Sequence, residues 1–219
     1  MTKPKTAAQP RQAAKPKLSK AKVIAVFGAR GTGKSGWIKQ HPEVRAAKRL
    51  LIWDYMHEYQ QIATPVSTLA EALQAMRGKA WRVAYQVDHS KQEAAFELLC
   101  KAARMAGNCT LLVEELAFVT KANKAPAAWR EATLLGRHNG VTIVGASQRP
   151  ASVDKDFIAC ADIIHTGRLA NIPDAKAVAT FLGCDWSELL KLPDLHYLEM
   201  DAQKRETRRG VLQFGKKLG

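Results

Sequence analysis

The sequence predicts an α/β fold of three layers, in which a mostly parallel central sheet lies between two layers of helices. Short runs of almost wholly apolar residues, such as Val23–Phe27 and Val141–Ser147, are typical of strands that are buried on both faces. Segments with helical spacing separate these runs, as the crossover connections of parallel strands require. A glycine-rich stretch at residues 28–35 joins the first apolar run to the first expected helix.

The other predicted elements follow from the same periodicities and from their stop signals. Apolar runs that close on glycine, acidic or polar residues indicate strands, and amphipathic segments that close on glycine or asparagine indicate helices. Strands are predicted at residues 23–27, 50–53, 81–87, 110–113, 141–147 and 162–165, with an edge strand at 196–200. Helices are predicted from about residue 34 and at residues 70–76, 92–105, 127–138 and 174–182, with a further turn at 186–190.

The composition excludes some classes of protein and favours an anionic partner. The chain has 219 residues, of which 47% are hydrophobic, so it can form a core and is not disordered throughout. No apolar run approaches the ~18 residues that a membrane-spanning helix needs. The formal net charge of +14 favours nucleic acid, a membrane surface or phosphate groups as a partner, without deciding among them.

The positive charge lies mainly at the two ends of the chain. Residues 1–22 hold seven basic residues, three prolines and no acid, which predicts a disordered basic tail. Residues 23–200 hold 21 basic and 18 acidic residues and are predicted to form the folded domain. Residues 201–219 are predicted to form a second basic tail, and either tail would suit the phosphates of DNA or an acidic membrane or capsid surface.

The strongest motif is GARGTGKS at residues 28–35, which fits the pattern G-x-x-x-x-G-K-[ST] between a strand and a helix. Glycines let backbone N–H groups converge on phosphate oxygens without interference from Cβ atoms. Lys34 is expected to reach the β- and γ-phosphates of ATP, and the Ser35 hydroxyl is expected to bind Mg²⁺. The candidate nucleotide-binding residues are Gly28, Arg30, Gly31, Thr32, Gly33, Lys34 and Ser35.

Two adjacent carboxylates follow the apolar strand predicted at residues 110–113. Glu114 is expected to stand near the Mg²⁺ ion, through a water molecule, and so is a candidate metal residue together with Ser35. Glu115 is expected to polarise the attacking water as a general base. The alternative is an acidic strand end that caps a following helix.

Gln148 and Arg137 complete the candidate catalytic set. Gln148 follows the strand predicted at residues 141–147 and can hydrogen-bond the γ-phosphate or the water, although a simple turn residue is the alternative. Arg137 lies in the sequence Gly-Arg-His-Asn-Gly, where it could neutralise charge on a neighbouring subunit's nucleotide. Its alternative role is that of a cation at a helix C-terminus. Arg130 is a weaker candidate for the same role.

Asp54 closes the second predicted strand and therefore lies where strand ends meet a nucleotide crevice. His57 and Glu58 follow it, but adjacent side chains on a helix point apart, so a structural role is favoured over a metal site for this pair.

Taken in order, these motifs resemble the FtsK–HerA superfamily of P-loop ATPases. The resemblance covers roughly residues 23–200 and depends on GARGTGKS, the strand-end glutamates, the Gly-Arg pair and the string Ser-Gln-Arg-Pro at 147–150. It is closest to the small genome-packaging ATPases of tailless, membrane-containing viruses. Those proteins usually have an Asp at the metal site, where this chain has Glu114. The resemblance implies a RecA/FtsK-like P-loop sandwich, with Glu115 activating water, Gln148 as the sensor and Arg137 acting in trans.

The resemblance also implies partners and a location. It implies a homo-oligomeric ring, typically a hexamer, that pumps double-stranded DNA through a central pore into a preformed capsid. Partners at the capsid vertex or among viral membrane proteins would follow, and the protein would be found in the host cytoplasm and in the virion.

Three other functions remain open from the sequence. A filamentous-phage assembly ATPase of the Zot type shares the core architecture but usually carries a membrane span. A P-loop kinase should show an arginine-rich lid, and residues 169–194 offer little arginine. The third is a DNA-binding protein that nucleotide holds together without catalysis.

Overall fold

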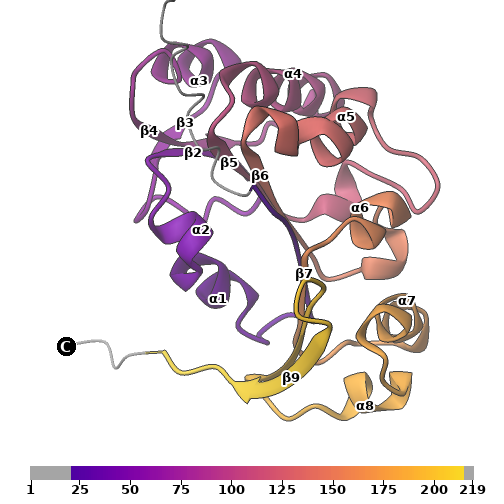
Figure 1. Ribbon diagram of the computed structural model, residues 1–219. Coiled ribbons are helices and arrows are strands. Elements are labelled where there is room, and N and C mark those ends of the chain that lie inside the picture. Colours follow the sequence, from indigo (N-terminus) through magenta and orange to yellow (C-terminus); the bar gives the residue numbers. More distant parts are fainter. Residues whose placement is uncertain (1–20, 215–219) are drawn as a thin grey trace, which may run out of the picture.

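The computed structural model describes residues 21–214, in which one nine-stranded sheet forms the centre of the fold (Figure 1). The strand order is β3-β4-β2-β5-β6-β1-β7-β8-β9. All pairings from β3 to β7 are parallel, whereas β8 runs antiparallel to β7 and β9 runs antiparallel to β8. The strands are β1 Val23–Phe27, β2 Arg49–Asp54, β3 Thr64–Val66, β4 Trp81–Gln86, β5 Cys109–Val113, β6 Val141–Ser147, β7 Ile163–Thr166, β8 His196–Asp201 and β9 Glu206–Val211.

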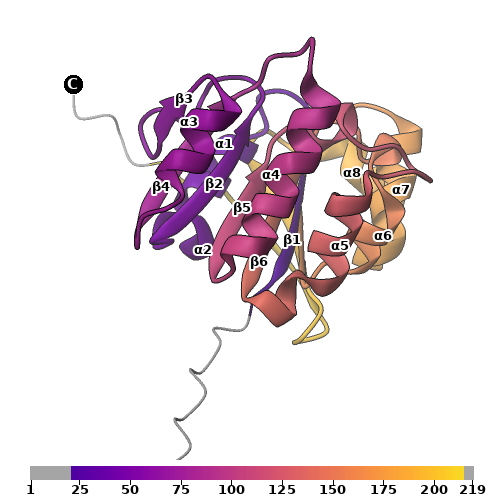
Figure 2. The ribbon, with the colours of Figure 1, turned by 90° about the horizontal axis from the view of Figure 1, so that it is seen from above.

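Helices cover both faces of this sheet, which confirms the predicted three-layer α/β fold (Figure 2). The first face carries α1 Lys34–Gln40 and α2 Pro42–Arg45, whose Ile38 and Val44 are fully buried in one apolar cluster. The second face has the larger cluster, to which every other α-helix contributes. These helices are α3 Leu69–Ala75, α4 Gln92–Ala106, α5 Ala127–Leu135, α6 Lys155–Ala159, α7 Ile172–Leu182 and α8 Trp186–Lys191.

The central strands owe their position to their composition. β1, β5 and β6 are buried along their whole length, as apolar residues on both strand faces require when helices cover both sides. Three 3₁₀ turns interrupt the connections: η1 Leu116–Phe118, η2 Gly136–Asn139 and η3 Pro150–Ser152. The helix predicted at residues 127–138 therefore ends at Leu135, and the tighter turn η2 takes its last residues.

The C-terminal boundary differs from the prediction. Residues 201–219 were expected to form a basic tail, but β9 pairs with β8 over its full length and is itself the edge strand. Arg208 is bound to Glu199, with Nη2 and Oε1 2.5 Å apart, and Arg209 is bound to Glu188 at 2.8 Å. Two of the expected tail cations are thus neutralised within the folded domain. Residues 1–20 and 215–219, the rest of the predicted tails, lie outside the described residues.

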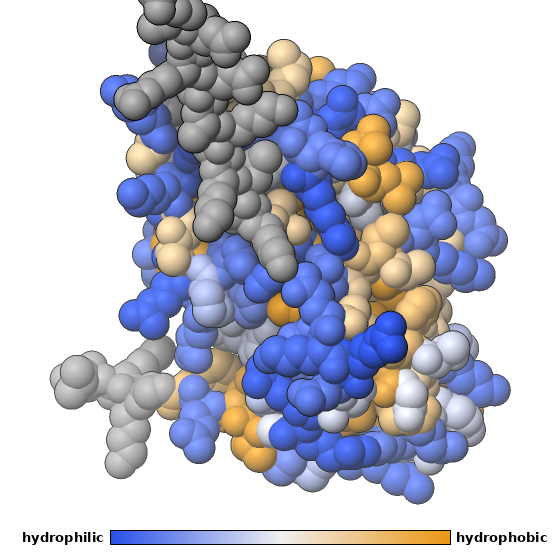
Figure 3. All heavy atoms as spheres, in the orientation of Figure 1, coloured by the Kyte–Doolittle hydropathy of each residue, from blue (hydrophilic) through white to orange (hydrophobic). Residues whose placement is uncertain are grey.

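The surface of the described chain is mostly hydrophilic on the face shown in Figure 3, with smaller hydrophobic areas between the polar ones. Within residues 21–214, none of the helices combines the length and the apolar character that crossing a bilayer requires.

Candidate nucleotide-binding site

The glycine-rich loop follows β1 and has backbone angles that residues with a Cβ atom rarely adopt. Gly28, Gly31 and Gly33 have φ values of 147°, 81° and 89°, in the region that glycine adopts without penalty. A Cβ atom on Gly28 would lie only 2.5 Å from Oγ1 of Thr32. Thr32 is buried and donates a hydrogen bond from Oγ1 to the carbonyl of Ala29 at 2.9 Å, which closes the loop on itself.

Lys34 lies folded into this loop. Its Nζ donates hydrogen bonds to the carbonyl oxygens of Gly28 at 2.8 Å and Ala29 at 3.1 Å. Burial lowers the pKa of Lys34, while the nearby carboxylates, Glu115 first among them, act in the opposite direction. A half-buried ammonium group held against a glycine-rich loop is suited to binding the phosphates of a nucleotide.

Ser35 brings its hydroxyl to two carboxylates from distant parts of the chain. Ser35 Oγ lies 3.4 Å from Oε1 of Glu114 and 3.2 Å from Oε2 of Glu58. The buried phenol of Tyr59 donates a second hydrogen bond to Oε1 of Glu114, at 3.2 Å. The predicted pair of Ser35 and Glu114 is therefore adjacent in the structure, and Glu58 and Tyr59 join it.

The Glu114 carboxylate fits a site that a cation would complete. Its pKa is raised from 4.5 to about 7, first by burial and then by the neighbouring charges of Glu58 and Asp54. Its second oxygen, Oε2, is buried and has no hydrogen-bond partner among the described residues. Carboxylate and hydroxyl oxygens are the ligands that Mg²⁺ prefers. No cluster of three His, Cys, Asp or Glu side chains within residues 21–214 is placed to hold a metal by itself.

Asp54 organises the segment that supplies Glu58 and Tyr59. The buried Asp54 carboxylate accepts hydrogen bonds from the backbone N–H of Glu58 at 2.8 Å and of Tyr59 at 3.2 Å. Burial raises the pKa of Asp54, although these two hydrogen bonds oppose the effect. The sequence favoured a purely structural role for the segment. The structure instead brings Glu58 to Ser35, while His57 is exposed and adopts a positive φ of 57°.

Glu115 and Gln148, which the sequence predicted separately as catalytic residues, are in contact. They follow the neighbouring strands β5 and β6, and Nε2 of Gln148 donates a hydrogen bond to Oε1 of Glu115 at 2.6 Å. Glu115 has φ 49° and ψ 50°, a left-handed conformation that costs a residue with a Cβ atom about 1 kcal/mol. The two consecutive carboxylates have different partners, since Glu115 contacts Gln148 while Glu114 contacts Ser35 and Tyr59.

The three candidate arginines, Arg30, Arg130 and Arg137, lie in different parts of the structure. Arg137 donates from Nη2 to Asp162 at 2.9 Å, and the same Asp162 oxygen accepts the backbone N–H of Val23 at 2.8 Å. Val23 begins β1 and the glycine-rich loop follows its end, so the structure does not bring Arg137 to the loop of its own subunit. Arg30 is exposed in the loop, and Arg130 lies on α5, 3.5 Å from Asp156.

The comparisons with known proteins agree with this geometry. No protein-family model matches the sequence. Protein P9 of Pseudoalteromonas phage PM2 is 29% identical over 175 residues, which cover 78% of this chain and 79% of P9. The genome-packaging NTPase B204 of Sulfolobus turreted icosahedral virus 2, solved in complex with AMPPCP, superposes with a TM-score of 0.75 over 90% of this chain and 100% of that chain, at 20% identity. The chain has the fold of the NTPase B204.

This P-loop fold also extends to proteins of other kinds. The N-terminal domain of zonular occludens toxin from Neisseria meningitidis matches 91% of this chain and 97% of its own, with a TM-score of 0.51 and 14% identity. The higher score for B204 confirms, at the level of fold, the resemblance to packaging ATPases that the motifs indicated.

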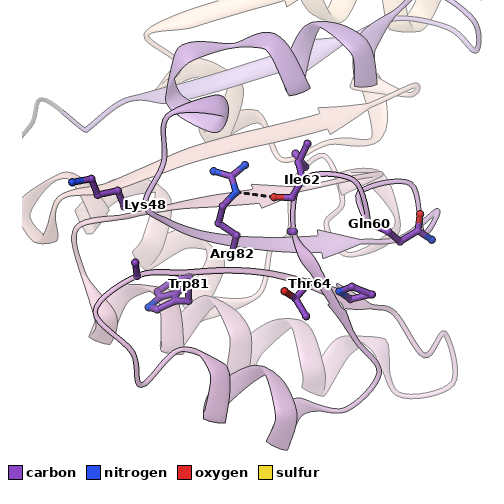
Figure 4. Close-up of a pocket in the computed structure, with 9 residues that line it drawn as sticks. Lys48, Gln60, Ile62, Thr64, Trp81 and Arg82 are labelled. Atoms are coloured by element: carbon purple, nitrogen blue, oxygen red, sulfur yellow. Dashed lines mark hydrogen bonds between the residues drawn. The ribbon is translucent and has the colours of Figure 1, made fainter. Parts of the chain in front are cut away.

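One surface pocket of the described chain lies away from the P-loop. It has a volume of about 730 Å³ and is found at the β3–β4 edge of the sheet (Figure 4). There Nε of Arg82 donates to the carbonyl of Ile62 at 2.7 Å, and Nη1 donates to that of Ala47 at 2.6 Å. These hydrogen bonds tie β4 to the backbone of the segments that line the pocket.

Proposed function

We propose that this protein is a Mg²⁺-dependent ATPase that drives packaging of a double-stranded DNA genome into a viral capsid. The observation that carries the proposal is the pair of Glu115 and Gln148, joined at 2.6 Å, in the same site as Lys34 and Ser35 of the glycine-rich loop. The similarity to the genome-packaging NTPase B204 supports the choice of packaging among the many functions of this fold.

The loop would bind the triphosphate through its backbone and through Lys34. In the structure the Lys34 ammonium group is held by two carbonyl oxygens, which are weaker partners than phosphate oxygens. Exchange of these partners would bring Lys34 onto the β- and γ-phosphates without moving the loop. The exposed Arg30 guanidinium is positioned to add a further cation at the surface of the same loop.

Ser35 and Glu114 would hold Mg²⁺, Glu114 through a bound water, with Glu58 beside them. Bound there, the ion would neutralise charge on the β- and γ-phosphate oxygens. The free Oε2 of Glu114 is available to accept a hydrogen bond from a water of the ion. The Tyr59 hydroxyl fixes the other oxygen of Glu114 and so orients the carboxylate.

Glu115 would act as the general base of hydrolysis. A water molecule attacks the γ-phosphorus, its proton passes to the Glu115 carboxylate, and the bond between the γ-phosphorus and the bridging oxygen breaks to leave ADP and phosphate. Gln148 positions Glu115 through its N–H group and can turn its amide toward the γ-phosphate. Loss of the γ-phosphate would change the partners of Gln148, which is how this residue would report the state of the nucleotide.

The proposal includes a ring of identical subunits, most simply a hexamer. Arg137 can act only on the nucleotide of a neighbouring subunit, since in its own subunit it lies at the opposite edge of the sheet. The partners would be double-stranded DNA in the pore and proteins of the capsid vertex or the viral membrane. The protein would act in the host cytoplasm and remain in the virion.

The DNA contact would be made to phosphates and would not depend on sequence, because a translocating motor meets every sequence in turn. The basic residues at the two ends of the chain could supply it. Deletion of residues 1–20, followed by measurement of DNA affinity against salt concentration, separates this role from docking on an acidic membrane or capsid surface.

The alternative functions make different products or need different partners. A kinase would transfer the γ-phosphate to a small acceptor, and a non-catalytic protein would release no phosphate. ATP hydrolysis measured with long double-stranded DNA therefore tests the proposal. Lys34→Ala is the control, since loss of the phosphate-binding ammonium group should abolish nucleotide binding.

A further inference from the structure

The chain returns to the P-loop after its last strand. Beyond β9, Leu212 donates a backbone hydrogen bond to the carbonyl of Leu195 at 2.9 Å, and the side chains of Leu212 and Phe214 then pack over the first turn of α1. Val211 and Phe214 are exposed hydrophobic residues of this segment.

The contact explains two glycines of the loop and helix. A Cβ atom on Gly33 would lie 2.6 Å from Cδ1 of Leu212, and a Cβ atom on Gly36 would overlap the ring of Phe214. Gly36 lies inside α1, where glycine costs about 1 kcal/mol relative to alanine. The ring of Phe214 therefore occupies the space that any other residue at position 36 would fill.

Phe214 lies on the opposite side of the loop from the catalytic pair, Glu115 and Gln148. Glu115 and Gln148 follow β5 and β6, which lie on one side of β1, whereas Phe214 follows β9 on the other side. All of them lie at the end of the sheet where β1 ends. Thr166 of β7 pairs with Phe27 at the end of β1 and with Leu198 of β8, so the antiparallel strand β8 starts at this end. β9 is antiparallel to β8 and therefore finishes there, with Val211 opposite His196. A triphosphate with its γ-end at Glu115 has its nucleoside at the opposite end of the loop, which is where Phe214 lies.

We propose that Phe214, flanked by Leu212 and Leu195, is the surface on which the base and ribose of the bound nucleotide pack. The inference rests on the proposed function, since it requires that the loop binds a nucleoside triphosphate. Phe214 is 41% exposed although its ring packs against Gly33 and Gly36, so part of the residue is open to a ligand. An aromatic ring stacks on any base, so this surface adds affinity without choosing between adenine and guanine.

The test compares two ligands that differ in the nucleoside alone. Dissociation constants for a non-hydrolysable ATP analogue and for inorganic tripolyphosphate are measured with the full chain and with Phe214→Ala, Phe214→Leu and Phe214→Trp. We expect Phe214→Ala to weaken the ATP analogue at least fivefold and to leave tripolyphosphate within twofold, in line with stacking energies of about 1–3 kcal/mol per base. Phe214→Leu should behave like the alanine variant, and Phe214→Trp should keep or improve the affinity.

Phe181→Ala is the matched control, because Phe181 is 38% exposed but lies on α7, on the face of the sheet opposite α1. It should change neither dissociation constant. The inference is overturned if Phe214→Ala binds the ATP analogue as the wild type does, if it binds it more tightly, or if both ligands weaken equally, which would assign the ring to support of the loop. A wild-type protein that binds neither ligand contradicts the proposed function itself.

Discussion

Gln148 and Glu115 are 33 positions apart in the chain, yet Nε2 of Gln148 lies 2.6 Å from Oε1 of Glu115. Each residue follows a buried strand, and the two strands are neighbours in the sheet. The contact is charge-assisted if Glu115 is ionised, and such hydrogen bonds are stronger than neutral ones. It leaves the second carboxylate oxygen of Glu115 available to a water molecule, so the pair can act as one catalytic unit.

Removal of the Glu115 carboxylate should separate binding from turnover. We expect Glu115→Gln to retain ATP binding within a few-fold and to lose at least a hundredfold in kcat, because general bases contribute about 10²–10⁴ in rate. The measurements are phosphate release and the Kd of an ATP analogue. Glu206→Gln, which changes an exposed glutamate on β9, should leave both unaltered. Hydrolysis at the wild-type rate by Glu115→Gln would exclude Glu115 as the base.

The contribution of Gln148 should depend on Glu115. We expect Gln148→Ala to lower kcat about tenfold or more, and we expect the double variant Glu115→Gln/Gln148→Ala to be hardly slower than Glu115→Gln alone. Residues that act as a unit show such non-additive losses. Independent losses that multiply in the double variant would mean that Gln148 acts on the nucleotide without Glu115.

The raised pKa of Glu114 should make stability fall as the pH rises. In the folded, nucleotide-free protein the pKa of Glu114 is about 7, whereas in the unfolded chain its pKa is the ordinary value of 4.5. The folded state therefore binds more protons in this window, and its stability decreases until both states are ionised above about pH 7. Glu114→Gln removes the effect.

The measurement is the free energy of unfolding of both proteins at pH 5 and pH 8. Relative to Glu114→Gln, the wild type should lose about 2 to 3 kcal/mol between these two values. Addition of Mg²⁺ and an ATP analogue should reduce the loss, since a cation stabilises the ionised carboxylate. A difference between the two proteins that is the same at both pH values would show that Glu114 does not titrate in this range.

Arg137 provides a test of the ring. If it acts on the neighbouring nucleotide, Arg137→Ala subunits mixed with wild-type subunits should reduce hydrolysis more than in proportion to their number. Asp162→Asn is the control, because it removes the charge that pairs with Arg137 and leaves the guanidinium in place. A strictly proportional loss, or equal effects of the two variants, would assign Arg137 to its ion pair with Asp162 alone.

The sequence predicts the centre of this fold well and its periphery poorly. β1 and β6 have almost wholly apolar sequences that match their burial, and the loop motif is typical of a phosphate-binding turn between a strand and a helix. β3 consists of Thr, Pro and Val at the edge of the sheet and carries no periodic signal. Half of the β9 residues are charged and most are exposed, so its composition is that of a tail although its backbone is paired with β8.

The site divides in the same way. Ser35, Glu114, Glu115 and Gln148 follow strands or lie in the loop motif, so parallel topology alone brings them to one edge of the sheet. Glu58 reaches Ser35 only because Asp54 bends the chain after β2, through hydrogen bonds to the backbone. Phe214 reaches Gly36 only because a strand that resembles a tail returns the chain to the loop. Neither contact has a signal in local periodicity.

The most direct test of the central claim is the rate of ATP hydrolysis by the full chain with Mg²⁺, measured with and without long double-stranded DNA. We predict that DNA raises the rate several-fold, that the increase falls with salt because the contacts are to phosphates, and that Glu115→Gln abolishes the rate in both conditions. An equal rate with and without DNA would contradict a role in genome packaging, and transfer of the γ-phosphate to an acceptor other than water would contradict the hydrolytic mechanism.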